Sequence, residues 1–441
     1  MQATLDEPFT PVADALDRLE AAVSPLSGIV RELSPAMWAA DEPRLHAFSC
    51  ELASSARTTG CATTAYSGSA HLDRDRARAG AIGEALERYA ATFVPDGLVV
   101  ARAAELGGDA VSPDSYALFH ERQFVSGFPF ARFTPRTKLS WVEGFALGDG
   151  RPALLPAQLV YLRPLHHSEQ PIGYPTSNGL ACGPTLVEAI LAGLLELVER
   201  DAMMIAWSNR LALPLLAWEE GDVGSIDASV FAPTGLRYSS IDASGLLGIP
   251  VGIGIVHGAP GERAALALGA GCALRVEDAW RTSLAEAFSV LRWLRGLLHE
   301  EPTRRVVRTE DVRTLEDHMV FFGRPERAGE IAFLEASRVR RDVGDVLPVP
   351  NDTPREAVAE IVRRLARAGV SAYAADVTSP DVEELGLKVA RVLAPELCAL
   401  DVFGSAPYRG GVRRYRAACD AGLSDRPLSY EELNPLPHPY P

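Results

Sequence analysis

The stretch PTSNGLACGPTLVEAILAGLLELVERDAMMIAWS, residues 175–208, decides the fold of this chain. It opens as a loop of small residues and glycines, and from Thr185 onward apolar residues recur at helical spacing. We therefore predict a helix over 185–208 that begins directly after a glycine-rich loop. Backbone N–H groups and the helix dipole favour an anion at such a helix start, so this loop is a candidate anion site.

The predicted helix carries acidic side chains along one face. At about 100° per residue, Glu188 and Glu199 fall within roughly 20° of each other, and Glu196 lies about 60–80° away. Arg200 is the only basic residue of the segment, and the opposite face is apolar. A buried acidic stripe repels itself, and Mg²⁺ is the simplest partner because it prefers carboxylates combined with phosphates. Thr185 and Glu188 also fit a capping box, which is an alternative role for Glu188.

A second predicted helix, over residues 77–93, contains the run GEALER at 83–88. Glu84, Glu87 and Arg88 share one face because they stand at i, i+3 and i+4. Two carboxylates one turn apart suit a divalent cation, and an arginine beside them suits a phosphate. The alternative is an exposed charged face with a Glu84–Arg88 ion pair. A second E-x-x-E-R run, at 196–200, favours the metal.

Helices and strands alternate along the rest of the chain. Helical spacing predicts a long helix over 277–299 and shorter ones over 354–368 and 381–394. Apolar and β-branched runs predict strands at 139–147, 250–256, 263–271, 370–377 and 397–404. The pattern is that of an α/β (α+β) protein, with mixed or antiparallel sheets flanked by helices. No long linker interrupts it, so we expect a single compact multi-layer domain.

Composition excludes several classes of protein. The chain has 43 Lys+Arg against 58 Asp+Glu, a formal net charge of −15, whereas nucleic acid and anionic membranes are bound through basic surfaces. No apolar run is long enough to predict a membrane span, and the N-terminus lacks the features of a signal peptide. We expect a cytoplasmic protein that binds neither nucleic acid nor membrane. Six cysteines without metal-type spacing predict free thiols: Cys50, Cys61, Cys182, Cys272, Cys398 and Cys419.

Four segments together resemble the YcaO family. They are GEALERYA at 83–90, TSNGLACGPTLVEAILAGLLELVERDA at 176–202, WRTSLAEA at 280–287 and NPLPHPYP at 434–441. The closing P-x-P-x-P is similar to that of the azoline-forming cyclodehydratases, which install thiazoline and oxazoline rings in ribosomally made peptides. The resemblance implies a YcaO domain over 24–441, with a proline-rich tail at 435–441, after an N-terminal extension at 1–23.

The resemblance implies an ATP site that holds more than one Mg²⁺. The metal-facing carboxylates are matched by Glu84, Glu87, Glu188 and Glu199. The nucleotide site is matched by Ser177, Asn178, Glu196, Arg88, Arg200 and Glu286. The tail is implied to enter the active site, where the Pro441 carboxylate or His438 would be the general base. The Asp317–His318 pair resembles a further family segment, which we expect to be structural.

The chain departs from the family pattern at several positions. Gly80 stands where serine is usual, and Pro184 stands where asparagine is frequent. The glycine–lysine loop before the first helix reads SGSAH at 67–71, with Ala70 and no lysine. In the third motif Glu286 is present, but Ser289 replaces glutamine and Arg292 comes one residue late. The departures at Gly80, at Pro184 and in the 67–71 segment each remove a polar contact to the nucleotide, whereas those at Ser289 and Arg292 make the match of the third motif partial.

The resemblance implies an ATP-dependent cyclodehydratase that acts on Cys, Ser or Thr of a precursor peptide. Only about two dozen residues precede the matched part, so we expect a separate E1-like partner that binds the leader peptide, and a homodimer of this chain. Two alternatives remain. One is a YcaO protein of other chemistry, which forms a thioamide or an amidine. The other is a non-catalytic peptide-binding scaffold.

Overall fold

A computed structural model describes residues 7–56, 61, 64–163, 169–218 and 221–440. The chain divides into two compact units. The first comprises residues 1–37, 46–197 and 350–397, and the second comprises 38–45, 198–349 and 398–441. Helix α5 (Leu186–Ser208) contributes its first half to the first unit and its second half to the second. None of the described helices combines the length and the apolarity that a membrane crossing requires.

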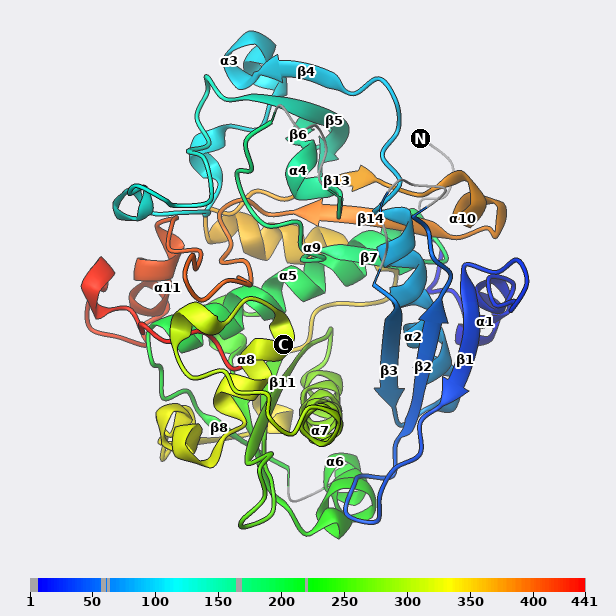
Figure 1. Cartoon of the computed structure of the whole chain (residues 1–441), viewed down its shortest axis with the longest axis vertical. Helices are drawn as coiled ribbons and strands as arrows, with labels where there is room; N and C mark the ends of the chain where they lie inside the picture. The colour runs from blue at the N-terminus through cyan, green and yellow to red at the C-terminus, as the bar shows by residue number, and fades with distance from the viewer. Residues whose placement is uncertain (1–6, 57–60, 62–63, 164–168, 219–220, 441) are drawn as a thin grey trace. The chain divides into compact units, whose positions relative to one another are not determined.

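A three-stranded antiparallel sheet of the first unit supports helix α2 (Arg74–Ala90). Its strands are β1 (Val30–Pro35), β2 (His46–Leu52) and β3 (Tyr66–His71). The side chain of Asp73 caps α2 by accepting from the Arg76 N–H, and α1 (Val12–Glu20) packs against the same helix. Because α2 also lies against β2 and β3 (Figure 1), its apolar residues face this sheet.

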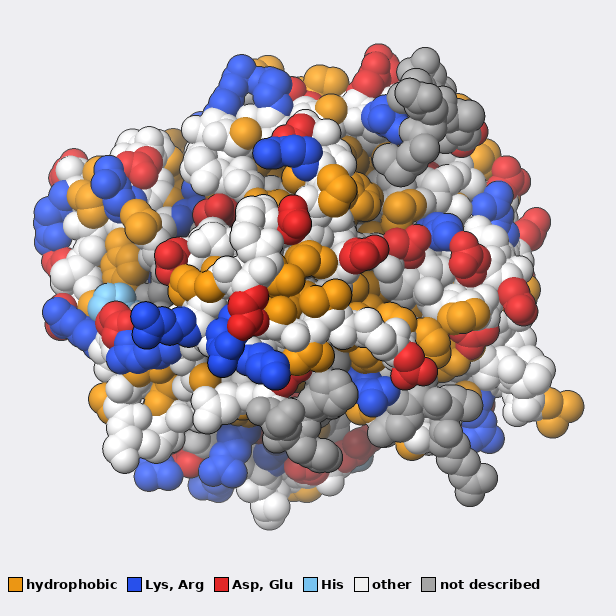
Figure 2. Space-filling model, turned by 90° about the horizontal axis from the view of Figure 1, so that it is seen from above, with side chains coloured by type: hydrophobic (Ala, Val, Ile, Leu, Met, Phe, Trp, Pro, Cys, Tyr) orange, Lys and Arg blue, Asp and Glu red, His pale blue; other side chains and the backbone are white. Residues whose placement is uncertain are grey.

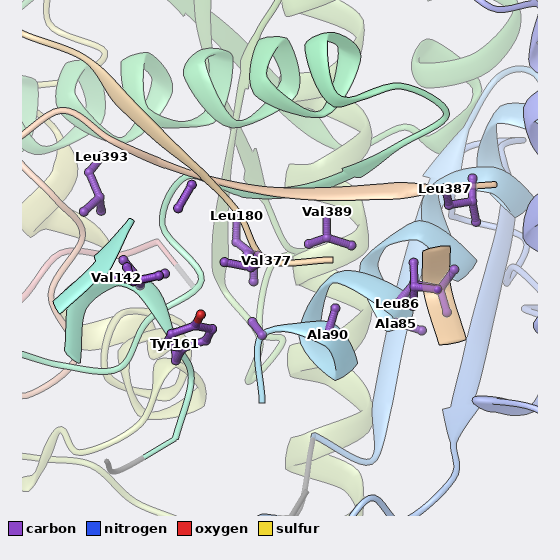
Figure 3. Close-up of a cluster of buried hydrophobic side chains, with 14 of the residues drawn as sticks. Ala85, Leu86, Ala90, Val142, Tyr161, Leu180, Val377, Leu387, Val389 and Leu393 are labelled. Carbon is purple, nitrogen blue, oxygen red and sulfur yellow. The ribbon is translucent and has the colours of Figure 1, made fainter. Parts of the chain in front are cut away.

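The second sheet of the first unit is antiparallel throughout. Its strand order is β4 (Val99–Arg102), β5 (Lys138–Ala146), β13 (Tyr373–Asp376), β14 (Lys388–Leu393) and β7 (Leu180–Gly183), with β6 (Pro152–Pro156) on β5. Figure 3 shows Ala85, Leu86 and Ala90 of α2 in the same buried cluster as Leu180 and Val389. This packing fixes the rotation of α2 and therefore the direction of its acidic face.

The second unit is built on one five-stranded sheet. Its strand order is β11 (Leu266–Cys272), β10 (Val251–His257), β9 (Arg237–Asp242), β8 (Leu215–Ala217) and β12 (Arg340–Asp342). Only the β8–β12 pair is parallel among these described strands. Helix α7 (Val276–Glu300) lies across β10 and β11 (Figure 1). The approach is close, because a Cβ at Gly254 would lie 2.4 Å from the carbonyl oxygen of Ser283.

The remaining helices are short, apart from α9. In the first unit they are α3 (Ala103–Leu106), α4 (Ala157–Val160), α9 (Pro354–Arg367) and α10 (Pro380–Glu384), and in the second α6 (Gly221–Ile226), α8 (Leu315–Phe322) and α11 (Arg413–Asp420).

Figure 2 shows acidic and basic side chains together across one face of the surface. All six cysteines are free thiols, as the sequence predicts.

The mixture of helices and antiparallel sheets confirms the predicted α/β (α+β) class. The long helices and most strands lie within a few residues of their predicted positions. The helix predicted over 381–394 is wrong, because α10 ends at Glu384 and Gly386 then adopts φ +71°, after which β14 pairs between β13 and β7. The strand predicted over 397–404 is also wrong. There the Cys398 N–H donates to the Asp201 carboxylate rather than to a neighbouring strand.

Candidate functional site

Strand β3 and helix α2 together hold Glu84. The Gly68 N–H donates to Oε2 of Glu84 at 2.9 Å, and Nη2 of Arg88 donates to Oε1 at 2.5 Å. The Glu84–Arg88 pair expected for an exposed helix face is therefore present. Both side chains are less than one-third exposed, at 29% and 28%, so this face is not fully solvated. The SGSAH segment, which the sequence suggested to be a loop, forms β3 and supplies a backbone donor instead of a lysine.

Glu87 lies among like charges. Burial raises the pKa of its carboxyl well above the usual value, and the negative charges of Glu196 and Glu84 raise it further. The positive charges of Arg88 and Arg391 offset only part of this effect. Three of the carboxylates predicted from sequence, those of Glu84, Glu87 and Glu196, are thus within electrostatic reach of one another. Such a group either binds a proton or needs a cation.

Arg391 is a residue of this group that the sequence reasoning missed. It lies on β14 with only 2% of its surface exposed, and its guanidinium donates to the carbonyl oxygens of Leu159 and Thr176. The sequence predicts a helix over 381–394, and that prediction gives no indication of an arginine buried between strands. Its place between two strands makes it instead a buried positive charge near Glu87.

The glycine-rich loop before α5 also binds a carboxylate. The Gly179 N–H donates to Oε2 of Glu196 at 2.7 Å, and Asn178 beside it is buried. Gly179 has φ +77°, and a Cβ there would lie 2.3 Å from the carbonyl oxygen of Val392, so this position requires glycine. Ser177 accepts a backbone bond from Leu180 that closes the turn. The predicted loop residues and Glu196 therefore form one local structure.

Glu188 is occupied at the start of α5. The Thr185 hydroxyl accepts from the Glu188 N–H at 3.2 Å and donates to the Glu188 carboxylate at 2.8 Å. The N–H and hydroxyl of Thr10 also donate to that carboxylate, at 2.8 and 3.0 Å. The Thr185 hydroxyl thus caps the helix, which is one half of the capping box considered as an alternative, and the Glu188 carboxylate bonds to the same hydroxyl. Metal binding by Glu188 stays a prediction.

In the second unit, Glu199 and Glu286 are held by the edge strand β11. The Cys272 N–H donates to Oε2 of Glu199 at 3.1 Å, and the Ala270 N–H donates to Oε2 of Glu286 at 2.8 Å. These two N–H groups are two residues apart and point away from the β10 side of the sheet. Burial and the Glu199 charge raise the pKa of the Cys272 thiol well above its usual value, so the thiol stays protonated.

The C-terminal tail is buried in the second unit from Pro437 to Tyr440, whereas Pro435 is exposed. The Asn434 N–H donates to the Ser208 carbonyl at 2.8 Å, and the Trp207 indole donates to the Leu436 carbonyl at 3.1 Å. The Tyr440 hydroxyl lies 2.7 and 2.8 Å from the two carboxylate oxygens of Glu286. The tail is therefore packed rather than frayed. Sequence reasoning singled out its prolines and histidine and missed this tyrosine.

Tyr440 also contacts the E-x-x-E-R end of α5. Its hydroxyl donates to Oε1 of Glu199 at 3.1 Å, and the Arg200 guanidinium lies 4.4 Å from the centre of its ring. Nε of Arg200 is 3.7 Å from Oε1 of Glu199. Glu199, Arg200 and Glu286, all predicted as site residues, thus meet around one side chain of the tail.

His438 is buried against His318. The two rings stack at 3.9 Å, Nε2 of His438 lies 2.7 Å from the Asp401 carbonyl oxygen, and Nδ1 of His318 lies 2.7 Å from the His438 carbonyl oxygen. Burial lowers the pKa of both imidazoles to about 4, so both are neutral at physiological pH. His318 has the structural role expected of it, as an anchor for the tail. Pro441 lies outside the described residues, and the role of either group as a base stays a prediction.

The departures from the family pattern have local explanations. A Cβ at Gly80 would lie 2.5 Å from Oγ of Ser69 on β3, so glycine lets helix and strand approach. Ser289 donates to the Ala285 carbonyl of its own helix. Arg292 stacks on Trp38 at 5.0 Å. These residues are thus engaged in packing within their own units.

The donor set of the first unit fits a hard divalent cation. Glu84, Glu87 and Glu196 offer carboxylate oxygens, which Mg²⁺ prefers. Burial and the charge of Glu87 raise the pKa of the Cys182 thiol to about 12, so no thiolate competes for a softer metal. Two basic groups, Arg88 and Arg391, are present beside the acids, as phosphate oxygens would require.

Comparison with known proteins places the fold. A heterocyclase in complex with substrate and cofactor is 24% identical, with a TM-score of 0.78 over 98% of this chain and 57% of its own. The heterocyclase TruD is also 24% identical, with a TM-score of 0.71 over 99% of this chain and 55% of its own. The chain therefore spans little more than half the length of these two heterocyclases. YcaO from Methanopyrus kandleri, bound with AMPPCP and Mg²⁺, gives a TM-score of 0.62 at 21% identity, over 91% of this chain and 94% of its own.

Sequence comparison adds one relative and one family. An uncharacterized protein of Methanothermobacter thermautotrophicus is 26% identical over 359 residues, which cover 78% of this chain and 84% of that protein. The model of a single family, described as YcaO cyclodehydratase, ATP- and Mg²⁺-binding, matches residues 69–398, which is most of the chain. The chain therefore belongs to the YcaO family.

Proposed function

We propose that this chain is an ATP-dependent cyclodehydratase that converts Cys, Ser or Thr residues of a ribosomally made precursor peptide into thiazoline or oxazoline rings. The observation that carries the proposal is a group of three acids, Glu84, Glu87 and Glu196, which lie within electrostatic reach of one another inside the part of the chain that the YcaO family model matches. Mg²⁺ carried by a nucleotide would neutralise this group. The family is described as ATP- and Mg²⁺-binding, and we therefore propose Mg²⁺ bound to ATP as the cation that neutralises these carboxylates.

The proposed reaction removes one water from the peptide at the expense of ATP. The side-chain sulfur or oxygen attacks the preceding amide carbon, loses its proton to a base and leaves a tetrahedral hemiorthoamide. The former amide oxygen then takes the γ-phosphoryl group, which releases ADP. When the carbon–oxygen bond breaks, that oxygen departs with the phosphate, the nitrogen loses its proton and a C=N bond completes the ring. Poor leaving ability of the oxygen is the difficulty that phosphorylation removes.

The residues of the chain have distinct proposed roles in this reaction. Glu84, Glu87, Glu188 and Glu199 are the proposed metal ligands, and the metal would screen the charge of the triphosphate. The proposed contacts to the nucleotide are made by Ser177, Asn178, Glu196, Arg88, Arg200 and Glu286. Proton removal from the nucleophile is assigned to the Pro441 carboxylate or to His438. The neutral His438 ring has the protonation state that a base requires.

A partner protein and a homodimer belong to the same proposal. The E. coli microcin synthetase McbBCD complex with pro-MccB17 bound contains a chain that gives a TM-score of 0.61 at 12% identity, over 99% of this chain and 100% of that one. That similarity supports a YcaO chain working beside other proteins on a peptide. We propose that a separate E1-like protein binds the leader peptide and presents the rest of the precursor to a dimer of this chain.

Peptide mass tests the proposal directly. The full chain is incubated with ATP, Mg²⁺, a candidate precursor and its E1-like partner, and we expect the peptide to lose one water per modified residue. Glu199→Gln should abolish that loss, whereas Glu360→Gln, at a surface ion pair of the first unit, should not. ATP hydrolysis without any change in peptide mass would overturn the proposal. A mass gain equal to the exchange of oxygen for sulfur would indicate thioamide formation instead.

A further inference from the structure

The side chain of Tyr440 contacts two carboxylates of the second unit, those of Glu199 and Glu286. Tyr440 has none of its surface exposed. Its hydroxyl lies within 3.1 Å of Oε1 of Glu199 and within 2.8 Å of both oxygens of Glu286. A phenol has one hydrogen to share among these three oxygens. The hydroxyl is thus a bridge between two acids rather than a partner of one.

Backbone donors complete this arrangement. Glu199 accepts the Cys272 N–H on Oε2, and the Tyr440 hydroxyl, whose single hydrogen is shared with Glu286, lies 3.1 Å from Oε1. Two donors on the two oxygens of one carboxylate fix both its position and the plane of its oxygens. The plane of the carboxylate is therefore set, which suits the binding of a cation with strict coordination geometry.

The ring of Tyr440 acts on the adjacent arginine. The Arg200 guanidinium lies 4.4 Å from the ring centre, within the range of a cation–π contact. The side chain of Arg200 is 15% exposed, so little solvent competes for it. One residue of the tail thus orients both a proposed metal ligand and a proposed phosphate-binding group.

We propose that Tyr440 is a positioning residue: its hydroxyl orients Glu199 for Mg²⁺, and its ring orients Arg200 for the phosphates. The proposal rests on the proposed function, because it assigns Glu199 to the metal. Tyr440 is not a catalytic residue, since it acts through the two neighbouring side chains. Outer-shell donors of this kind change metal affinity by about 10- to 100-fold when they are removed.

The test separates the hydroxyl from the ring. Binding of AMPPCP to the full chain is measured by calorimetry at increasing Mg²⁺ concentration, so that no turnover is involved. Tyr440→Phe should raise the Mg²⁺ concentration for half-maximal binding about 10-fold and leave AMPPCP affinity at saturating Mg²⁺ unchanged. Tyr440→Leu should in addition weaken AMPPCP binding at saturating Mg²⁺, because it removes the ring beneath Arg200.

Tyr238→Phe is the matched control. The hydroxyl of Tyr238 donates to Oδ1 of Asp227 at 2.7 Å within the same unit, so this variant also removes one tyrosine–carboxylate hydrogen bond. It should leave both binding parameters unchanged, and the melting temperature of each variant checks the fold. An unchanged Mg²⁺ midpoint in Tyr440→Phe overturns the inference alone. A wild-type chain that binds no AMPPCP in the presence of Mg²⁺ overturns the proposed function and the inference with it.

Discussion

The two halves of helix α5 place their carboxylates in different surroundings, although Glu196 and Glu199 each accept a backbone N–H. In the first unit Glu196 shares its surroundings with Glu87 and Glu84, and the pKa of Glu87 rises by burial and by these neighbouring charges. In the second unit Glu199 is held by a backbone donor and a phenol, and Asp201 is paired with an arginine. Acidic residues only a few positions apart on one helix thus form a repelling group and a satisfied group. The first group favours the binding of a cation, and the second group holds its side chains in fixed positions.

The largest expected effect lies in the satisfied group, at Asp201. This side chain is fully buried, with two hydrogen bonds of 2.7 and 2.9 Å from Arg413 to Oδ2 and one of 2.9 Å from the Cys398 N–H to Oδ1. Asp201→Ala leaves a buried arginine unpaired, so the free energy of unfolding should fall by about 3–5 kcal/mol. Denaturant unfolding of the purified chain measures this change.

A double variant tests the reason for that loss. Asp201→Ala combined with Arg413→Leu removes the charge that the single variant leaves buried, so it should recover most of the lost stability. Glu360→Ala, which disrupts partly exposed ion pairs with Arg363 and Arg364 on one helix, should cost about 1 kcal/mol or less. If the single and double variants prove equally unstable, the pair does not stabilise the second unit through its charge.

The next effect concerns the repelling group. Glu87→Gln removes a carboxylate from among like charges, so the metal-free chain should gain about 1 kcal/mol of stability. Turnover should fall by about 100-fold or more, since about 3 kcal/mol of metal-dependent stabilisation of the transition state is lost. Thermal unfolding without metal and phosphate release with Mg²⁺ measure the two effects. A destabilised variant that retains turnover would contradict this description of the first unit.

How much of this contrast the sequence predicts depends on the range of the interactions. Periodicity within α2 and α5 indicated Glu84, Glu87, Glu196 and Glu199, because a helix face is a local property, but it did not indicate Asp201. Arg391 and Tyr440 were missed, since each acts through pairing with residues far away in sequence. Arg391 needed β14 to be recognised as a strand, and the turn at Gly386 that ends α10 was the available sign. Nothing in the tail itself shows that Tyr440 meets Glu286, 154 residues earlier.

Hydrogen-bond donors lower the pKa of a carboxyl group, whereas neighbouring negative charges raise it. The stability of the protein should therefore respond to pH in opposite directions in the two cases. Glu335 in the second unit is bonded by His257 at 2.9 Å and by Ser239 at 2.8 Å. Burial raises the pKa of its carboxyl, but these bonds and the nearby charges of His257 and Arg237 lower it more, from 4.5 to about 2. Its stabilising contribution is therefore fully present above pH 4.5 and is lost as the pH falls from 4.5 towards 2.

Replacing the Glu335 carboxylate should abolish this loss of stability at low pH. After allowance for its partial exposure, Glu335→Gln should cost about 2 kcal/mol at neutral pH and nothing near pH 2. Unfolding by denaturant at pH values between 2 and 7 gives the two curves, which should converge at the acid end. Parallel curves over the whole range would show that the bonds to Glu335 do not depend on its charge.

The smallest expected effect decides between two roles at the start of α5. Thr185→Ala removes the cap that accepts from the Glu188 N–H, so the free energy of unfolding should fall by about 1 kcal/mol while turnover below the melting temperature stays unchanged.

Glu188→Gln keeps an acceptor for Thr10 and Thr185 but loses the negative charge. If Glu188 belongs to the metal ligands, this variant should need more Mg²⁺ for half-maximal phosphate release at nearly unchanged stability. If the side chain serves only the cap, its Mg²⁺ dependence should match that of the wild type, and the repelling group then consists of Glu84, Glu87 and Glu196 alone.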